Sequence, residues 1–171
     1  IAAVVSDREG AYALERARLA GIPALVVAAD PSLPREARRR ELSGRILALA
    51  RGRGVGLIIL AGFLSILAGE IIEAYAGRII NLHPALLPKF GGPGMYGERV
   101  HRAVLAAGEA ESGCTVHLVD GGTDTGPILL QRRVPVLAGD SAGSLARRIS
   151  GEEHIAIVEA AALMVERLAG R

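Results

Sequence analysis

Apolar runs alternate with amphipathic helical patterns along the first half of the chain. The predicted strands are residues 1–7, 23–30, 55–62 and 77–83. The predicted helices between them are residues 11–21, 34–53 and 67–77. These strand segments are apolar on both faces, which is typical of a parallel sheet covered by helices.

The second half follows a different pattern. A helix at 97–109 precedes two strands at 113–120 and 126–136, which a short Gly-rich loop joins into an expected antiparallel pair. The closing helix at 141–168 begins in "GDSAGS", a favourable N-cap context. We therefore predict an α/β fold: one Rossmann-like domain over 1–171, with a mostly parallel, open, twisted sheet and helices on both faces.

The start of the chain is abrupt, because residue 1 already lies in a strand pattern. Mononucleotide-binding folds normally begin with a strand, a Gly-rich phosphate loop and a helix. We expect such a βα unit, of roughly 30 residues, to be missing upstream.

The composition of the chain argues against two classes of function, nucleic-acid binding and a role that needs a membrane span. The chain has 171 residues, a net charge of +2 and only 3% aromatic residues, so its core is built from aliphatic side chains. The basic run 35–41 alternates in sign like a solvated helix face and has no interleaved aromatic residues, so no nucleic-acid partner is expected. No run is long enough for a membrane span, and the single Cys114 fits a reducing, cytoplasmic location as a buried, inert thiol.

The segment "INLHPALLPKFGGPG" at 80–94 contains the only asparagine, Asn81, and then His83 at the end of an apolar run. Ligands of open α/β sheets bind beyond the carboxyl ends of the strands. Pro84 keeps His83 out of the helical region, so the imidazole is expected at the edge of a crevice.

Two further loops are expected at this edge. "LAGFLSIL" at 60–67 leaves a neighbouring strand through Gly62, and "VDGGTDTGP" at 119–127 carries two aspartates. Taken alone, the first segment is equally typical of an ordinary strand-to-helix turn, and the second is most often a turn and less often a cation-binding loop. The second loop lacks the ligand spacing of a calcium site, so no metal is predicted.

Asn81, His83 and Asp124 together suggest acyl chemistry. An Asn amide can donate a hydrogen bond to a developing oxyanion, and a His can move a proton between two nitrogens. A nearby carboxylate raises the pKa of an imidazole, so we expect His83 to keep a proton near neutral pH. No Ser or Cys lies beside a base, which favours direct transfer to an external amine.

The other histidines are weaker candidates. We expect His101 on the surface and His154 in a structural role, whereas His117 either points to the pocket or packs locally. Glu153 could meet a ligand amine, but its spacing alone favours a solvated helix face.

Several segments occur in the same order as in a known family. "SDREGAYALERARLAGIP", "LAGFLSIL", "INLHPALLPKF", "HRAVLAAGEAESGCTVHLVDGGTDTGPILLQRRVPVLAGDS" and "EEH" closely resemble the phosphoribosylglycinamide formyltransferase family. The resemblance covers nearly the whole chain. The pair N-x-H-P and D-x-G-P, about 40 residues apart, is specific to folate-dependent formyltransferases.

The resemblance implies transfer of a formyl group from 10-formyltetrahydrofolate to the amine of glycinamide ribonucleotide, without a metal. It implies that Asn81 polarises the formyl oxygen, His83 donates the proton and Asp124 raises the pKa of His83. The implied folate-binding residues are Arg35, Leu64, Ser65, Ile66, Leu67, Asn81, Asp120, Gly121, Gly122, Thr123 and Asp124. The implied glycinamide-ribonucleotide-binding residues are Ser150, Gly151, Glu152 and Glu153.

Departures from the family pattern leave alternatives open. The N-terminal phosphate loop is not in this chain, Ser65 stands where many relatives carry Arg, and the Gly-rich loop at 91–97 is predicted to be a mobile flap. A formyltetrahydrofolate hydrolase is the closest alternative, and transfer to methionyl-tRNA or an amino-sugar nucleotide is a weaker one. A non-catalytic folate- or nucleotide-binding domain and assembly as a homodimer also stay open.

Overall fold

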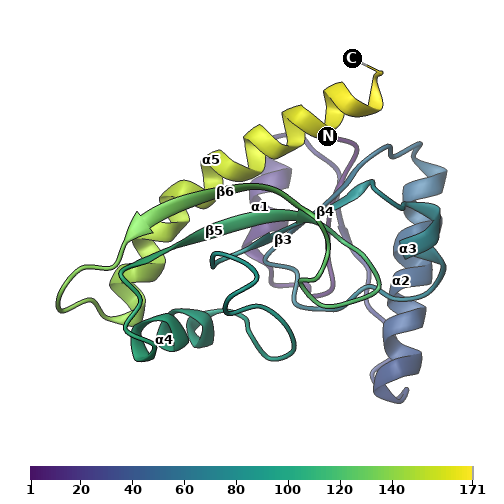
Figure 1. The fold of residues 1–171 in the computed structure, drawn as a ribbon. Coiled ribbons are helices and arrows are strands. Elements are labelled where there is room, and N and C mark those ends of the chain that lie inside the picture. The colour runs from purple at the N-terminus through teal and green to yellow at the C-terminus, as the bar shows by residue number, and fades with distance from the viewer. Residues whose placement is uncertain (171) are drawn as a thin grey trace. The chain divides into compact units, whose positions relative to one another are not determined.

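The computed structural model describes residues 1–170 and divides the chain into two compact units (Figure 1). The first unit contains Ile1–Gly56 and Phe63–Tyr75, and the second contains Leu57–Gly62 and the chain from Ala76 onward.

The first unit contains a β-α-β element followed by two helices. Its elements are β1 (Val4–Ser6), α1 (Tyr12–Leu19), β2 (Ala24–Val26), α2 (Arg35–Gly52) and α3 (Glu70–Ala74). β1 and β2 pair in parallel, with α1 as the connection between them. Gly21, at a φ of +67°, follows the end of α1 in the left-handed conformation that glycine adopts easily.

Helix α2 buries one apolar stripe and exposes its charges. Leu42, Ile46 and Ala50 recur at helical spacing on the buried face. The hydroxyl of the buried Ser43 accepts a hydrogen bond from the Ala68 amide, which ties the segment before α3 to α2. On the exposed side Glu36 pairs with two arginines along the helix, which confirms the solvated, sign-alternating face predicted for 35–41.

The second unit is built on a four-stranded sheet in the order β3-β4-β5-β6. Its elements are β3 (Ile58–Ala61), β4 (Ile79–His83), α4 (Glu98–Ala106), β5 (Glu111–Leu118), β6 (Ile128–Pro135) and α5 (Ala142–Leu168). β3 is parallel to β4, whereas β4-β5 and β5-β6 are antiparallel.

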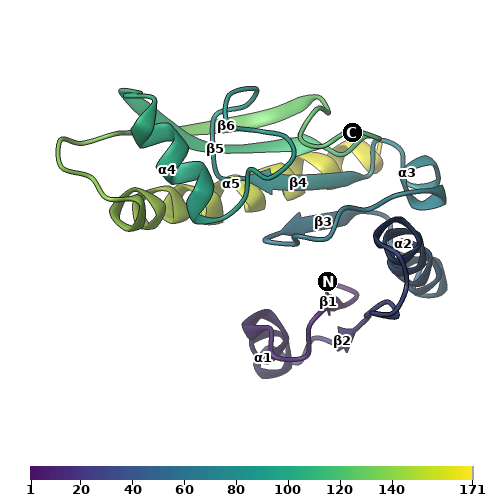
Figure 2. The same cartoon turned by 90° about the horizontal axis from the view of Figure 1, so that it is seen from below.

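Helix α5 lies along one face of this sheet and closes the core of the second unit (Figure 2). Ser141 begins the helix with a capping box, in which its side chain and that of Ser144 each bond the other residue's main-chain amide. Leu145, Ile149 and Ala156 are fully buried against Cys114 and Val116 of β5. Burial of these aliphatic side chains is the main stabilising contribution of this face.

The predicted elements are present, and the α/β class with an open sheet is confirmed. The single, mostly parallel sheet is not observed: the hydrogen-bonded strands form two separate sheets, and β4 joins β5 in antiparallel orientation. Apolar runs identify strands, but they do not identify pairing partners, which here depend on the long connection from β4 to β5. None of the helices within residues 1–170 is long and apolar enough to span a membrane.

Candidate active site

Four polar side chains share one face of β4 and β5. Asn81 pairs with His117 and His83 pairs with Thr115 in the antiparallel register. Because residues opposite each other across a sheet point to the same side, these side chains face away from the α5 core, into which Ile80 points. The same two strands therefore build the core on one face and a polar cluster on the other.

The turn after His83 is held by the side chains of two neighbouring strands. The Thr115 hydroxyl accepts from the Leu87 amide at 3.0 Å and donates to the Ala85 carbonyl at 2.6 Å. Gln131 of β6 donates to that hydroxyl and to the Leu87 carbonyl, each at 2.9 Å. The hydroxyl thus uses its donor and both acceptor positions. The sequence indicated only that Pro84 keeps His83 out of the helical region, and the Thr115–Gln131 pair adds fixed contacts to this turn.

The loop that presents Asp124 is shaped by its own hydrogen bonds. Asp120 accepts from the Gly122 amide at 2.9 Å and from the Thr125 hydroxyl at 2.7 Å. Gly126 passes so close to the main chain that a Cβ there would lie 1.8 Å from the Leu118 carbonyl oxygen. Asp124 itself adopts a φ of +58°, an unusual conformation for a non-glycine residue. Such strain is typical of functional sites.

The Asp124 carboxylate meets both histidines. One oxygen accepts from the Gly92 amide at 3.0 Å and lies 3.5 Å from His83 Nδ1. The other oxygen lies 3.5 Å from His117 Nε2, which is itself 3.1 Å from Asn81 Nδ2. The His83 and Asp124 side chains are only 4% and 11% exposed. The three predicted catalytic residues thus belong to one nearly buried cluster that also contains His117.

Main-chain groups of the loop that begins at Phe90 form hydrogen bonds with His83 and Asp124 of this cluster. His83 Nε2 lies 2.8 Å from the Phe90 carbonyl oxygen, and the Gly92 amide is the donor to Asp124. Phe90 and Gly92 both have positive φ, at +56° and +92°. A reactant that needs His83 Nε2 must therefore replace a main-chain partner supplied by this loop.

Burial decides the protonation of His83. Desolvation lowers the pKa of His83, and the Asp124 carboxylate and the Phe90 carbonyl offset this only in part. The predicted direction of the Asp124 effect is right, but the expectation that His83 stays protonated near neutral pH is wrong, because burial is the larger effect. Burial also opposes ionisation of Asp124, yet the nearby histidines and the Gly92 amide keep the pKa of that carboxyl below its ordinary value.

The residues predicted to bind folate fall into both units. Asp120, Gly121, Gly122 and Thr123 belong to the same loop as Asp124. Arg35, exposed at the start of α2, and the segment 64–67 belong to the first unit. There the Ser65 hydroxyl donates to the Asp7 carboxylate at 2.6 Å.

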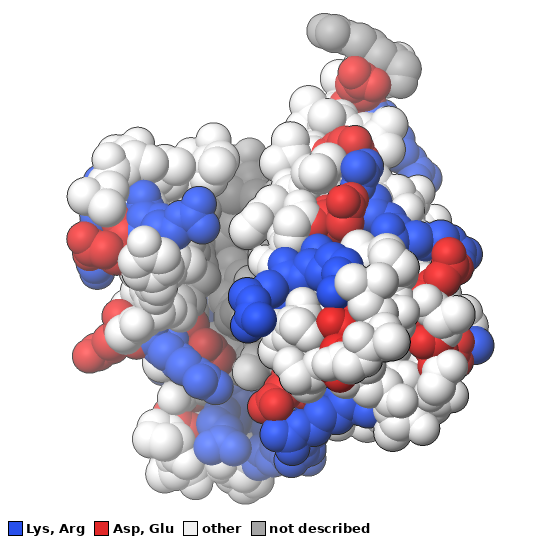
Figure 3. Space-filling view, turned by 90° about the vertical axis from the view of Figure 1, so that its left-hand side faces the viewer, with Lys and Arg blue, Asp and Glu red and all other residues white. Residues whose placement is uncertain are grey.

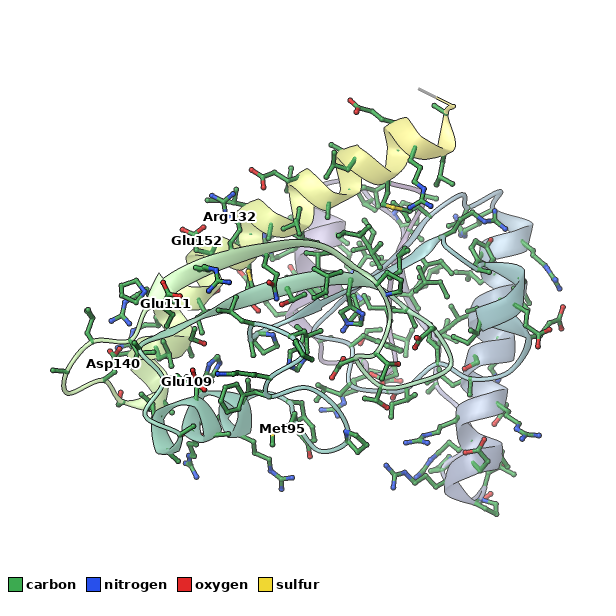
Figure 4. The ribbon with its side chains drawn as sticks, in the orientation of Figure 1. Met95, Glu109, Glu111, Arg132, Asp140 and Glu152 are labelled. Carbon is green, nitrogen blue, oxygen red and sulfur yellow. The ribbon has the colours of Figure 1, made fainter. Side chains whose placement is uncertain are left out.

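The residues predicted to bind glycinamide ribonucleotide lie on α5. Ser150, Gly151, Glu152 and Glu153 occupy consecutive positions there. Arg132 of β6 engages Glu152 at 2.5 Å and Glu159 at 3.0 Å (Figure 4). The carboxylate of Glu152 is therefore already paired. Glu153 is half-buried, and burial raises the pKa of its carboxyl.

Two of the remaining histidine predictions are wrong. His101 is only 6% exposed, its Nδ1 has no hydrogen-bond partner among residues 1–170, and burial lowers its pKa. It follows Val100 on the buried face of α4, so its position on that face, and not its polarity, decides its burial. His154 is exposed on α5 and not structural. Cys114 is buried, and burial raises the pKa of its thiol to about 11, as expected for an inert cysteine.

Charges elsewhere on the second unit are mostly paired. Arg133 contacts Glu111, Arg148 contacts Asp140, and Lys89 contacts Glu109. On the face seen in Figure 3, Lys and Arg side chains lie interspersed with Asp and Glu. Within residues 1–170, no group of three or more His, Cys, Asp or Glu side chains is arranged to hold a metal ion.

The chain matches the family described as formyl transferase over residues 1–161. It is 45% identical over 162 residues to the trifunctional purine biosynthetic protein adenosine-3 of Drosophila melanogaster, covering 95% of this chain and 11% of that protein. It is 42% identical over 154 residues to phosphoribosylglycinamide formyltransferase of Escherichia coli (strain K12), covering 90% of this chain and 68% of that protein. The chain therefore spans about a tenth of the first relative.

Solved structures of other proteins are also similar to this chain. The crystal structure of glycinamide ribonucleotide transformylase 1 from Symbiobacterium toebii matches with a TM-score of 0.86 and 40% identity, covering 100% of this chain and 75% of that chain. A formyltetrahydrofolate deformylase from Pseudomonas syringae pv. tomato matches with a TM-score of 0.82, 98% coverage of this chain and 52% of that chain. At 24% identity, the second match shows a common fold alone.

Proposed function

Since this chain belongs to the formyl transferase family, we propose that it transfers a formyl group from 10-formyltetrahydrofolate to the amine of glycinamide ribonucleotide in purine biosynthesis. The observation that carries this proposal is the convergence of Asn81, His83 and Asp124 in one nearly buried cluster. Similarity to proteins named phosphoribosylglycinamide formyltransferase supports the choice of substrates.

The mechanism starts with attack of the substrate amine on the formyl carbon. The new C–N bond forms as the carbonyl electron pair moves to oxygen, and the Asn81 amide donates a hydrogen bond to that oxyanion. His83, neutral because burial lowers its pKa, accepts the proton that the amine loses. The bond from carbon to the folate nitrogen then breaks, and that nitrogen takes the proton from His83.

Asp124 supports both stages of the transfer. Its carboxylate lies 3.5 Å from His83 Nδ1 and favours the imidazolium that exists only between the two proton transfers. The pKa of Asp124 is below its ordinary value, so the carboxylate is ionised when that charge develops. The only cysteine is buried and protonated, which favours direct transfer over a thioester intermediate.

Substrate binding is proposed at three places. Residues 120–124 would form one wall of the folate pocket, and the segment 64–67 with Arg35 would contact the pteridine and the acidic tail. Ser150 to Glu153 would contact the ribonucleotide, with Glu153 at the amine. Pairing of Glu152 with Arg132 favours Glu153 for that role. We further expect a cytoplasmic enzyme without nucleic-acid partners, and assembly as a homodimer stays open.

The alternative is hydrolysis of the same folate, in which water replaces the amine. The fold that the chain shares with a formyltetrahydrofolate deformylase is the observation behind this alternative. The two reactions differ in their dependence on the second substrate. A transferase forms tetrahydrofolate only when glycinamide ribonucleotide is present, whereas a hydrolase forms it without any amine.

The test is folate turnover with and without glycinamide ribonucleotide, by this chain and by a version extended with the upstream coding sequence. Each protein is measured beside its His83→Ala variant. Turnover that needs the amine and is lost in His83→Ala supports the proposal. Turnover without the amine supports the hydrolase. Folate binding without turnover in both proteins contradicts an enzymatic role and favours a binding module.

A further inference from the structure

We propose that His117 is a positioning residue that holds the amide of Asn81 in the orientation needed to donate to the oxyanion. This inference rests on the proposed function and adds to it a residue outside the Asn81, His83 and Asp124 set. His117 is 2% exposed and lies directly opposite Asn81 in the strand register.

The orientation follows from the hydrogen bonds of the His117 ring. Its Nδ1 lies 2.8 Å from the Leu118 carbonyl oxygen, which only accepts hydrogen bonds. In its neutral form an imidazole has one N–H, and in that form of His117 this contact uses it. Nε2 is then an acceptor, and the group 3.1 Å away must be a donor, namely the Asn81 amino group.

One N–H of Asn81 thus goes to His117, and the second stays available for the formyl oxygen. If the amide were rotated by half a turn, its carbonyl oxygen would face the bare Nε2 of His117, where two acceptors would oppose each other. The rotated amide would also present its oxygen to the oxyanion. His117 excludes this orientation, because an unpaired buried acceptor is costly.

The strand geometry at this point is specialised. The register between β5 and β6 shifts at Val116/His117, where the partner of Val116 is Leu130 and that of His117 is Ile128. Such irregularities re-aim side chains next to active sites. The groups that face the ring are the Asn81 amide and the Asp124 carboxylate, whose Oδ1 lies 3.5 Å from Nε2. The shorter contact with Asn81 identifies it as the main partner.

Kinetics separate this role from a structural one. His117→Phe keeps a flat ring but removes the acceptor, whereas His117→Gln can present its amide oxygen near the position of Nε2. Loss of one oxyanion donor costs about 100-fold to 1,000-fold in kcat, so we expect a loss of about 10-fold to 100-fold for His117→Phe. His117→Gln should recover most of this loss, with the KM for the folate nearly unchanged in both.

A double-mutant cycle with Asn81→Ala identifies the partner. If His117 acts through Asn81, His117→Phe has little further effect in the Asn81→Ala protein. Full multiplication of the two losses, or full activity of His117→Phe, would overturn the inference while leaving the transferase proposal intact. Full activity of Asn81→Ala would instead contradict the proposed mechanism itself.

A measurement on the unmutated chain does not depend on turnover or on the folding of variants. The chain has one Asn and one Gln, so its side-chain amide NMR spectrum contains two NH₂ groups, those of Asn81 and Gln131. The inference predicts an unprotonated His117 Nε2 by ¹⁵N shift and a hydrogen bond from Asn81 to it. A protonated Nε2, bonded to Asp124, would overturn the inference.

Discussion

The two faces of the β4–β5 strand pair differ in what their side chains do. On one face Ile80, Cys114 and Val116 pack under α5. These side chains contribute to stability by burying apolar surface. On the other face Asn81, His83 and His117 each contact another polar group at a defined distance. Neighbours along one strand, 3.8 Å apart at Cα, therefore have separate tasks, and substitutions on the two faces should change different observables.

The largest effect is expected on the polar face. His83→Ala removes the group that moves the proton, so kcat should fall by about 100-fold to 10,000-fold while the thermal midpoint changes little. Single-turnover kinetics and thermal melting measure the two quantities on the same sample. A loss of activity that merely follows a loss of folding would mean that the two faces are not separable.

The opposite result is expected on the core face. Ile80→Ala, next to Asn81 in the chain, should lower the free energy of unfolding by about 2–5 kcal/mol because it leaves a cavity in a fully buried site. Denaturant titration measures this loss. At temperatures where the variant is folded, kcat should stay within a small factor of the unmutated value, and Ile80→Val should show the same trend with a smaller loss.

A polar residue that only supports the site should show both effects. Thr115→Val removes a buried hydroxyl that has three hydrogen-bond partners, so we expect a loss of about 1–3 kcal/mol in stability and a moderate drop in kcat as the turn after His83 loosens. Thr115→Ser keeps the hydroxyl and is the matched control. Equal behaviour of the Val and Ser variants would contradict the role of the hydroxyl.

The smallest expected effect is on the pH dependence of kcat/KM, which reports the balance of burial and charge at His83 on the polar face. Burial lowers the pKa of His83 below that of an ordinary imidazole. Only the neutral imidazole accepts a proton, so kcat/KM should fall as the pH drops, with an apparent pKa below the ordinary histidine value. Asp124→Asn removes a carboxylate that raises this pKa, and the acid limb should therefore move to still lower pH. A pH–rate profile in which the limb moves upward would refute this balance of burial and charge.

Much of this arrangement could be predicted from the sequence. Asn81 and His83 ended an apolar run before Pro84, and Asp124 lay in a Gly-rich loop, so chain pattern and motif spacing were sufficient. Thr115 and Gln131 were missed because their contacts depend on the register of β4, β5 and β6, which hydrophobicity does not encode. That Gln131 is the only glutamine in the chain was the one available signal.

Properties that depend on depth of burial were harder to predict. The net pKa of His83 required the competition between desolvation and the Asp124 charge, and charge alone suggested the wrong sign. His101 was expected on the surface, but its position on the buried face of α4 outweighs its polarity.

The central claim is that Asn81, His83 and Asp124 act as one unit in formyl transfer to the amine of glycinamide ribonucleotide. The most direct test is the single-turnover rate of that transfer in the three alanine variants and in the triple variant. Groups that act as a unit are strongly non-additive, so the triple variant should be about as slow as the slowest single variant. A triple variant slowed by the product of the three single losses, or single variants with full activity, would contradict the claim.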